Sequence, residues 1–128
     1  MYAQLAFLLL ALAQLALGAD VTQYKFSVNL ENGVKDSFTI EVHDEWAPLG
    51  AARFHELVAA DFFPGVRFFR TIKGFMSQFG ISGKPEVSKV WRDKKIADDK
   101  RIESNKRGYL SFATSGKDSR TTQIFINL

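Results

Sequence analysis

The chain of 128 residues contains no cysteine and only two histidines. Without cysteine it can form no disulfide, thiol nucleophile or cysteine-ligated metal site, so a folded domain depends on its hydrophobic core alone. His43 and His55 are far apart in the sequence and match no metal-ligand spacing, so we expect a structural or surface role for each and no metal site. A hydrolase is also disfavoured, because the sequence has no GxSxG motif and neither histidine has an obvious nucleophile partner.

The rest of the composition is that of one ordinary globular domain. Hydrophobic residues make up 46% of the chain and charged residues 24%, which argues against disorder. The net charge of +3 falls short of a nucleic-acid-binding signature, so we expect no nucleic-acid partner. Phenylalanine is unusually frequent, with 12 residues, and in a domain of this size we expect most of them to fill the core.

The first 19 residues carry no charge, and residues 5–17 are almost wholly Leu, Ala and Phe. This run is shorter than the ~20 residues that span a bilayer, and its end supplies small residues at Ala16 and Gly18, as signal peptidase requires. We therefore predict a signal peptide over residues 1–18, a mature domain over residues 19–128 and no membrane association after cleavage. The expected location is the secretory pathway, either the endoplasmic reticulum lumen or the extracellular space. The opening MYAQ lacks the usual basic residue, which leaves an uncleaved anchor as the alternative.

Two segments alternate between apolar and polar side chains and flank the dipeptide Asn32-Gly33, a strong hairpin signal. The alternation predicts an antiparallel hairpin of residues 24–30 and 37–42 with one buried face. That face consists of Tyr24, Phe26, Val28 and Leu30 on the first strand and Phe38, Ile40 and Val42 on the second.

Pro48 then opens a helical pattern, since proline is well placed in the first turn of a helix. Phe54, Leu57 and Val58 form one apolar stripe that we expect to lie against the sheet. Residues 82–107 show no clear period and are predicted to be a solvated loop region held down by Trp91. Because residues 89–107 contain eight basic and four acidic residues, a docking surface for an acidic partner is the alternative.

The stretch VRFFRTIKGFMSQFG over residues 66–80 combines a predicted strand, with Arg70 near its centre, and a cluster after Gly74. Alternation places Val66, Phe68, Arg70 and Ile72 on one side of this strand. The cluster consists of Phe75, Met76 and Gln78. A permanent planar cation, an apolar surface and an amide in this order suit a site that grips an apolar ring and hydrogen-bonds an adjacent peptide group. Buried aromatic residues with an arginine at the strand rim are the alternative.

Residues 108–114 and 123–128 are predicted to be two further strands, joined by a polar loop. In the last strand, alternation separates a core face from a second face that is natural for the wall of a binding groove. The core face consists of Ile124, Ile126 and Leu128, and the groove face consists of Gln123, Phe125 and Asn127.

These motifs resemble the signature of cyclophilin-type peptidyl-prolyl isomerases, in which an arginine is followed five, six and eight residues later by Phe, Met and Gln. Arg70 and the cluster after Gly74 match at this spacing, and residues 108–113 and 121–126 resemble the family's later pocket strands. The resemblance runs from about Tyr24 to Leu128. It implies a mainly β fold with helices, an eight-stranded antiparallel barrel capped by an α-helix. Because the family continues well past Leu128, we expect the barrel and the domain to be incomplete at the C-terminus.

The resemblance also implies a catalytic role for Arg70, no cofactor and a monomer. The substrate-binding residues it implies are Phe75, Met76, Gln78, Ala113, Thr114, Gln123 and Phe125. The implied partners are proline-containing polypeptides, with a cyclosporin-type inhibitor as a further ligand. Phe69, Phe79 and Thr114 depart from the family pattern, in which His, Gly and Asn are common at these positions.

Three hypotheses follow from these residues. The first is a prolyl isomerase that acts in protein folding in the secretory pathway. The second is a non-catalytic module that binds proline peptides. The third is an incomplete fragment that does not fold, in which the strand ending at Leu128 would be an exposed, aggregation-prone edge.

Overall fold

The computed structural model describes residues 21–128, which contain six strands, two α-helices and a short 3-10 helix. The signal peptide predicted over residues 1–18 lies outside the described residues. The chain divides into two compact units between Glu45 and Trp46, and each is described by itself. Within residues 21–128, no helix is both long and apolar enough to cross a membrane.

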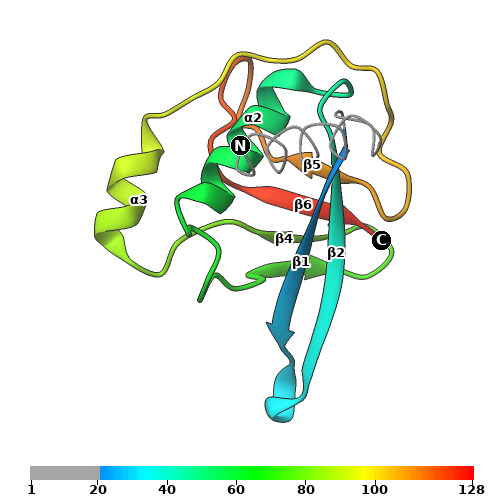
Figure 1. The fold of residues 1–128 in the computed structure, drawn as a ribbon, viewed down its shortest axis with the longest axis vertical. Coiled ribbons are helices and arrows are strands. Elements are labelled where there is room, and N and C mark those ends of the chain that lie inside the picture. The colour runs from blue at the N-terminus through cyan, green and yellow to red at the C-terminus, as the bar shows by residue number, and fades with distance from the viewer. Residues whose placement is uncertain (1–20) are drawn as a thin grey trace, which may run out of the picture. The chain divides into compact units, whose positions relative to one another are not determined.

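The first unit is an antiparallel hairpin of β1 (Val21–Asn29) and β2 (Lys35–His43), visible as the long pair of strands in Figure 1. Phe26 lies opposite Phe38, and their rings stack with centroids 5.5 Å apart. The predicted alternation is confirmed: Tyr24, Phe26 and Val28 are half-buried in β1, whereas Ile40 and Val42 are buried in β2. Leu30 was wrongly placed on this face, because it lies in the connection and is exposed.

The hairpin turn contains a 3-10 helix, η1 (Glu31–Gly33), and both residues of the predicted Asn-Gly pair adopt positive φ, 69° for Asn32 and 76° for Gly33. Asparagine tolerates this left-handed region better than most residues, and glycine enters it without a steric penalty. The dipeptide therefore allows the chain to reverse between β1 and β2.

The second unit contains a four-stranded antiparallel sheet in the order β3-β4-β6-β5, shown as the neighbouring short strands in Figure 1. The strands are β3 (Arg70–Ile72), β4 (Met76–Phe79), β5 (Leu110–Phe112) and β6 (Ile124–Asn127). The strand predicted over residues 66–72 therefore begins only at Arg70, where its ladder with β4 starts, although the N–H of Phe69 still donates to the carbonyl of Gln78 at 3.0 Å. The strand predicted over residues 108–114 is likewise restricted to β5.

β6 lies inside the sheet, between β4 and β5, and the edges are β3 and β5. In the folded structure the strand ending at Leu128 is therefore not an exposed edge, since its backbone pairs on both sides. Ile124 is buried as predicted, but Leu128 is 44% exposed and does not belong to the core. The backbone N–H of Leu128 donates to the carbonyl of Phe75, which links the end of β6 to the turn before β4.

Helix α2 (Pro48–Ala59) begins with the predicted proline and buries Phe54 and Leu57. The ring of Phe63 connects this helix to the sheet, because its centroid lies 5.4 Å from that of Phe54 and 6.0 Å from that of Phe79 in β4. Phe54 and Leu57 of the predicted apolar stripe are thus buried, and Phe63 links Phe54 to the sheet.

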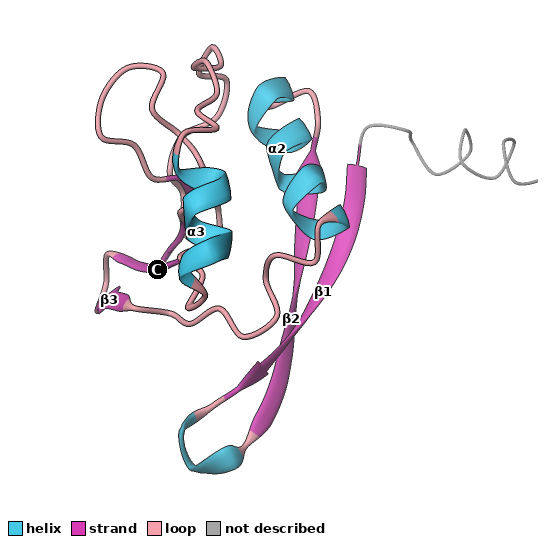
Figure 2. Cartoon of the chain, turned by 90° about the vertical axis from the view of Figure 1, so that its left-hand side faces the viewer, coloured by secondary structure: helices cyan, strands magenta, loops and turns pink. Residues whose placement is uncertain are grey.

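A second helix, α3 (Pro85–Arg92), lies within the region predicted to be a loop, and Figure 2 shows it with α2. The prediction of a solvated loop is wrong here. Of the residues of α3, only Val87 and Trp91 pack on the core. Two apolar residues at i and i+4 in a charged segment are too weak a periodic pattern to predict a helix. The anchoring role of Trp91 is confirmed, since it forms a buried cluster with Leu57 and Phe62.

Asp99 caps helix α2 from about fifty residues away in the sequence. Its carboxylate accepts hydrogen bonds from the backbone N–H groups of Leu49 (3.0 Å) and Gly50 (2.9 Å) and from Arg120 Nη2 (3.0 Å). Burial acts to raise the pKa of Asp99, but the three donors outweigh it, so the pKa lies below its ordinary value of 3.8. The cap fastens the long connection before β5 to the start of α2.

Taken together, the described residues form a mixed α/β structure with two antiparallel sheets. No closed barrel is seen in residues 21–128, where the strands form one sheet of two and one of four. Two α-helices, α2 and α3, belong to the second unit.

Candidate functional site

The strand register brings most of the predicted site residues to one face of the four-stranded sheet. Arg70 pairs with Gln78, and Gln78 pairs with Phe125 on its other side. Met76 lies two residues before Gln78 in the same strand. Directly paired residues and residues two apart in one strand point to the same side of a sheet. These four residues therefore share one face, and the buried Phe79 belongs to the other.

The remaining pocket residues continue this face at the ends of β5 and β6. The backbone N–H of Ala113 donates to the carbonyl of Gln123 at 2.9 Å, and Gln123 lies two residues before Phe125. Thr114 follows at the start of an exposed loop, where its hydroxyl lies 2.7 Å from Ser119 Oγ. Its side chain is therefore used within the loop.

Three polar side chains on this face form a continuous chain of hydrogen bonds. Arg70 Nη1 donates to Gln78 Oε1 at 3.4 Å, and Gln78 Nε2 donates to Gln123 Oε1 at 3.0 Å. Gln78 is only 8% exposed, so its two bonds fix its orientation. The Arg70 contact is long for a hydrogen bond and uses one of five N–H donors on an exposed side chain, so most of its donor capacity faces outward.

The apolar residues of the site differ sharply in exposure. Phe75 lies in the turn between β3 and β4 and is 60% exposed, whereas Met76 is only 2% exposed and Phe125 is half-buried. Ala113 is also half-buried. Phe75 therefore offers an open ring at the end of the face, whereas Met76 lies beneath the surface.

Of the eight predicted site residues, only Arg70 is ionisable, so the site offers a fixed cation, two amides and apolar surface. In the part of the chain that the structure describes, no three His, Cys, Asp or Glu side chains come together in a group that could hold a metal ion. This chemistry fits the recognition of a neutral peptide group and an apolar ring.

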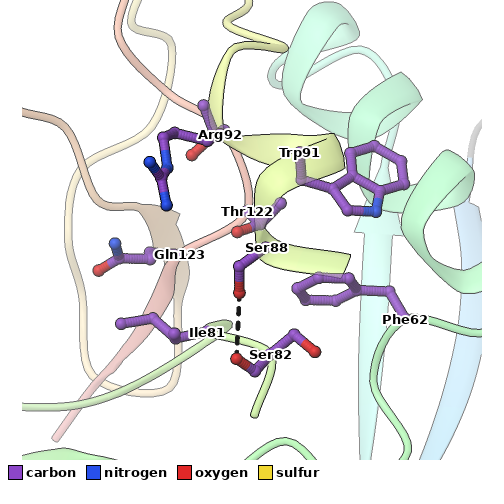
Figure 3. A pocket seen from close by; sticks show the side chains of 9 residues that line it. Phe62, Ile81, Ser82, Ser88, Trp91, Arg92, Thr122 and Gln123 are labelled. Atoms are coloured by element: carbon purple, nitrogen blue, oxygen red, sulfur yellow. Dashed lines mark hydrogen bonds between the residues drawn. The ribbon is translucent and has the colours of Figure 1, made fainter. Parts of the chain in front are cut away.

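Sequence reasoning missed a pocket beside Gln123, because one of its walls is formed by the unforeseen helix α3 (Figure 3). The pocket has a volume of about 250 Å³ and includes Ser88 and Arg92 from this helix. The run of basic residues in the sequence was a signal for a charged surface, but it did not single out Arg92.

A family model described as cyclophilin type peptidyl-prolyl cis-trans isomerase/CLD matches residues 26–128. This chain belongs to the cyclophilin family. The matched segment of this cyclophilin contains β6 and every predicted site residue, so the family resemblance of the motifs is confirmed.

Curated relatives of this cyclophilin come from plants, amoebae and bacteria. It is 37% identical over 105 residues to peptidyl-prolyl cis-trans isomerase CYP18-1 of Arabidopsis thaliana. The aligned region covers 78% of this chain and 64% of the relative. Identity is 34% to peptidyl-prolyl cis-trans isomerase-like 3 of Dictyostelium discoideum, over 78% of this chain and 63% of the relative. Peptidyl-prolyl cis-trans isomerase B of Bacillus subtilis is also 34% identical, over 76% of this chain and 66% of the relative. The matched part thus spans just under two thirds of the length of these relatives.

Proposed function

We propose that this cyclophilin catalyses the cis–trans isomerisation of X–Pro peptide bonds. The observation that carries the proposal is the alignment of Arg70, Gln78 and Gln123 in one hydrogen-bonded chain, on the same face as Phe125 and beside the exposed ring of Phe75. A cation and two amides thereby border apolar surface, which is what a proline ring and its flanking peptide groups require.

The barrier to this rotation is ~18–20 kcal/mol, because amide resonance must be broken. In the twisted transition state the prolyl nitrogen becomes pyramidal, and its lone pair becomes a hydrogen-bond acceptor. A guanidinium beside that nitrogen stabilises the transition state more than the planar ground state, and this difference is what accelerates the reaction. Arg70 has donors left for this purpose, and its fixed positive charge requires no proton transfer.

The other residues of the face would hold the substrate in place. Phe75, Phe125 and Ala113 would contact the pyrrolidine ring, with Met76 beneath them. Gln78 and Gln123 would hydrogen-bond the peptide backbone and keep it in register with the guanidinium. The contacts to the residues that flank the X–Pro bond would thus hold the prolyl nitrogen in line with the guanidinium.

A protease-coupled isomerisation assay on the full chain, with a proline peptide as substrate, tests this proposal. We expect acceleration by the unchanged protein, loss of at least about 90% of it in Arg70→Ala, and full activity in Arg101→Ala, an exposed cation outside the site. Equal activity in Arg70→Ala and the unchanged protein would overturn the catalytic role, provided that circular dichroism shows both to be folded.

A non-catalytic proline-peptide-binding module is the second candidate, and the burial of Met76 favours it. A 2% exposed Met76 gives a proline ring little access to the floor of the expected pocket. This candidate predicts that a proline peptide or a cyclosporin-type inhibitor binds to the full chain without any acceleration of isomerisation.

We further propose that the protein enters the secretory pathway and acts there on folding polypeptides. The support is the uncharged apolar segment at residues 5–17, with small residues at Ala16 and Gly18 around its end. Expression of the full chain in cultured eukaryotic cells, followed by N-terminal sequencing, tests the proposal. We expect a product in the lumen or the medium that begins at residue 19 or 20, and an intact cytosolic protein would contradict it.

A further inference from the structure

The pocket beside Gln123 lies between α3 and the segment that leads into β6 (Figure 3). Its base includes the buried rings of Phe62 and Trp91, whose centroids are 6.0 Å apart. With about 250 Å³ the pocket has room for a side chain, since a water molecule takes about 30 Å³.

The lining of this pocket is positively charged and rich in hydrogen-bonding groups. Its nine residues include four hydroxyl side chains, one amide and one cation, and none of them carries a carboxylate. The cation is Arg92, whose side chain extends from α3 toward Gln123 in Figure 3. Within residues 21–128 the Arg92 guanidinium has no hydrogen-bond or ion-pair partner, although it is the only charged group of the pocket.

Two of the four hydroxyl groups of the pocket donate hydrogen bonds to the backbone. Ser88 Oγ donates to the carbonyl of Ser82 at 3.1 Å, drawn as a dashed line in Figure 3, and the buried Thr122 donates its hydroxyl to the carbonyl of Gly80 at 2.8 Å. Both hydroxyl oxygens thus use their protons within the protein. Arg92 is an exposed cation whose donors are not used within residues 21–128, and an anionic acceptor is the kind of ligand that pairs with it.

Gln123 belongs both to this pocket and to the proposed groove. Its Oε1 accepts from Gln78 Nε2 at 3.0 Å, and Gln78 in turn contacts Arg70. A peptide whose X–Pro bond lies at Arg70 and whose backbone contacts Gln123 would therefore pass the mouth of the pocket. Successive residues of an extended peptide advance by about 3.3 Å, so a residue near the X–Pro bond reaches it.

We propose that this pocket is a specificity subsite for an acidic residue, Asp or Glu, close to the X–Pro bond of the substrate, with Arg92 as the specificity-determining residue. The inference rests on the proposed isomerase function for the position of the peptide. The side-chain carboxylate would pair with the Arg92 guanidinium, and its aliphatic stem would lie over the rings at the base of the pocket. The subsite selects among substrates and takes no part in the rotation itself.

The test uses proline peptides in pairs that differ only by Glu or Gln at one of the positions flanking the X–Pro bond. Binding to the full chain is followed by NMR titration, and isomerisation is followed by the coupled assay. We expect at least one Glu peptide to bind about five- to tenfold more tightly than its Gln partner at low salt. Arg92→Gln should abolish this preference without weakening the Gln peptide, whereas Lys89→Gln, an exposed cation of the same helix outside the pocket, should preserve it.

The outcomes separate this inference from the proposed function. If both members of every pair are isomerised and bind with equal affinity, the subsite is overturned and the proposed isomerase activity stands. A Glu preference that survives Arg92→Gln would have the same meaning. An Arg92-dependent preference in binding without any isomerisation would support the subsite and refute catalysis. Failure of every peptide to bind would overturn both.

Discussion

Replacement of Arg53 by methionine should strongly destabilise the protein, although this residue is not part of the proposed site. Arg53 is buried in helix α2, with only 6% of it exposed. Its Nη1 donates to two backbone carbonyls, that of Lys94 at 2.6 Å and that of Thr121 at 2.9 Å. The guanidinium also lies 5.4 Å from the ring centroid of Trp91. One side chain therefore joins α2 to the segment after α3 and to the segment before β6.

The magnitude follows from these contacts. A hydrogen bond from a charged donor contributes about 1.5–3 kcal/mol, so the loss of two costs about 3–6 kcal/mol. The half-exposed ion pair of Arg53 with Glu56 adds less than about 1 kcal/mol. Methionine regains about 1–2 kcal/mol by apolar packing, which leaves a net loss of about 1–5 kcal/mol in the free energy of unfolding. Against a typical total of about 5–15 kcal/mol, this loss is large.

Urea denaturation of the full chain, followed by circular dichroism, measures the effect. Arg101→Met is the matched control, because Arg101 is exposed, and we expect it to change the free energy of unfolding by less than about 0.5 kcal/mol. A loss below about 1 kcal/mol in Arg53→Met would refute the reasoning, since the two carbonyl contacts would then contribute almost nothing.

Two further predictions concern the segments around the site. Because the folded pKa of Asp99 is lowered, its contribution to stability is complete above the ordinary value of 3.8 and is lost as the pH falls through the lower folded value. Between about pH 5 and about pH 2, the unchanged protein should therefore lose stability more steeply than Asp99→Asn in urea titrations, and parallel curves would contradict this. Gly80→Ala should cost more than about 2 kcal/mol, because φ is +108° and a Cβ would lie 2.2 Å from the carbonyl oxygen of Thr122. Gly83→Ala is its control, since a Cβ there meets no atom within 4 Å, and equal stability of the two variants in urea would refute the clash.

Much of the hairpin and of α2 could be predicted from the sequence, because each rests on contacts between residues close in the chain. The alternation around Phe26 and Phe38 and the left-handed pair Asn32-Gly33 are local signals, and they predicted the hairpin and its buried face but not its register. Pro48 and the apolar stripe of α2 are local signals as well.

The errors arose where distant residues decide the structure. Helix α3 is only eight residues long, and Trp91 gains its burial from Phe62 and Leu57, which periodicity within the helix cannot reveal. The cap of α2 by Asp99 is equally invisible, since the donor and acceptor are about fifty residues apart. Pairing in the sheet also depends on neighbours far along the chain, which is why β6 is internal and β3 is short.

The candidate site was predictable in its members but not in its details. The spacing of Arg70, Met76 and Gln78 identified them, and the strand register places them on one face as a groove requires. The burial of Met76 and the bond between Gln78 and Gln123 depend on how β4 and β6 are packed, so the sequence could not provide them. The role of each residue in substrate binding stays a prediction.

The central claim is that the Arg70 guanidinium stabilises the twisted transition state through its planar set of donors. Two-dimensional exchange NMR at saturating proline peptide tests this claim directly, since it measures the interconversion of the bound cis and trans forms without a coupling protease. In Arg70→Lys, which keeps the positive charge but loses the planar donors, we expect the exchange rate to fall at least about tenfold while the peptide affinity changes less than about threefold. An unchanged exchange rate in this variant would contradict the account.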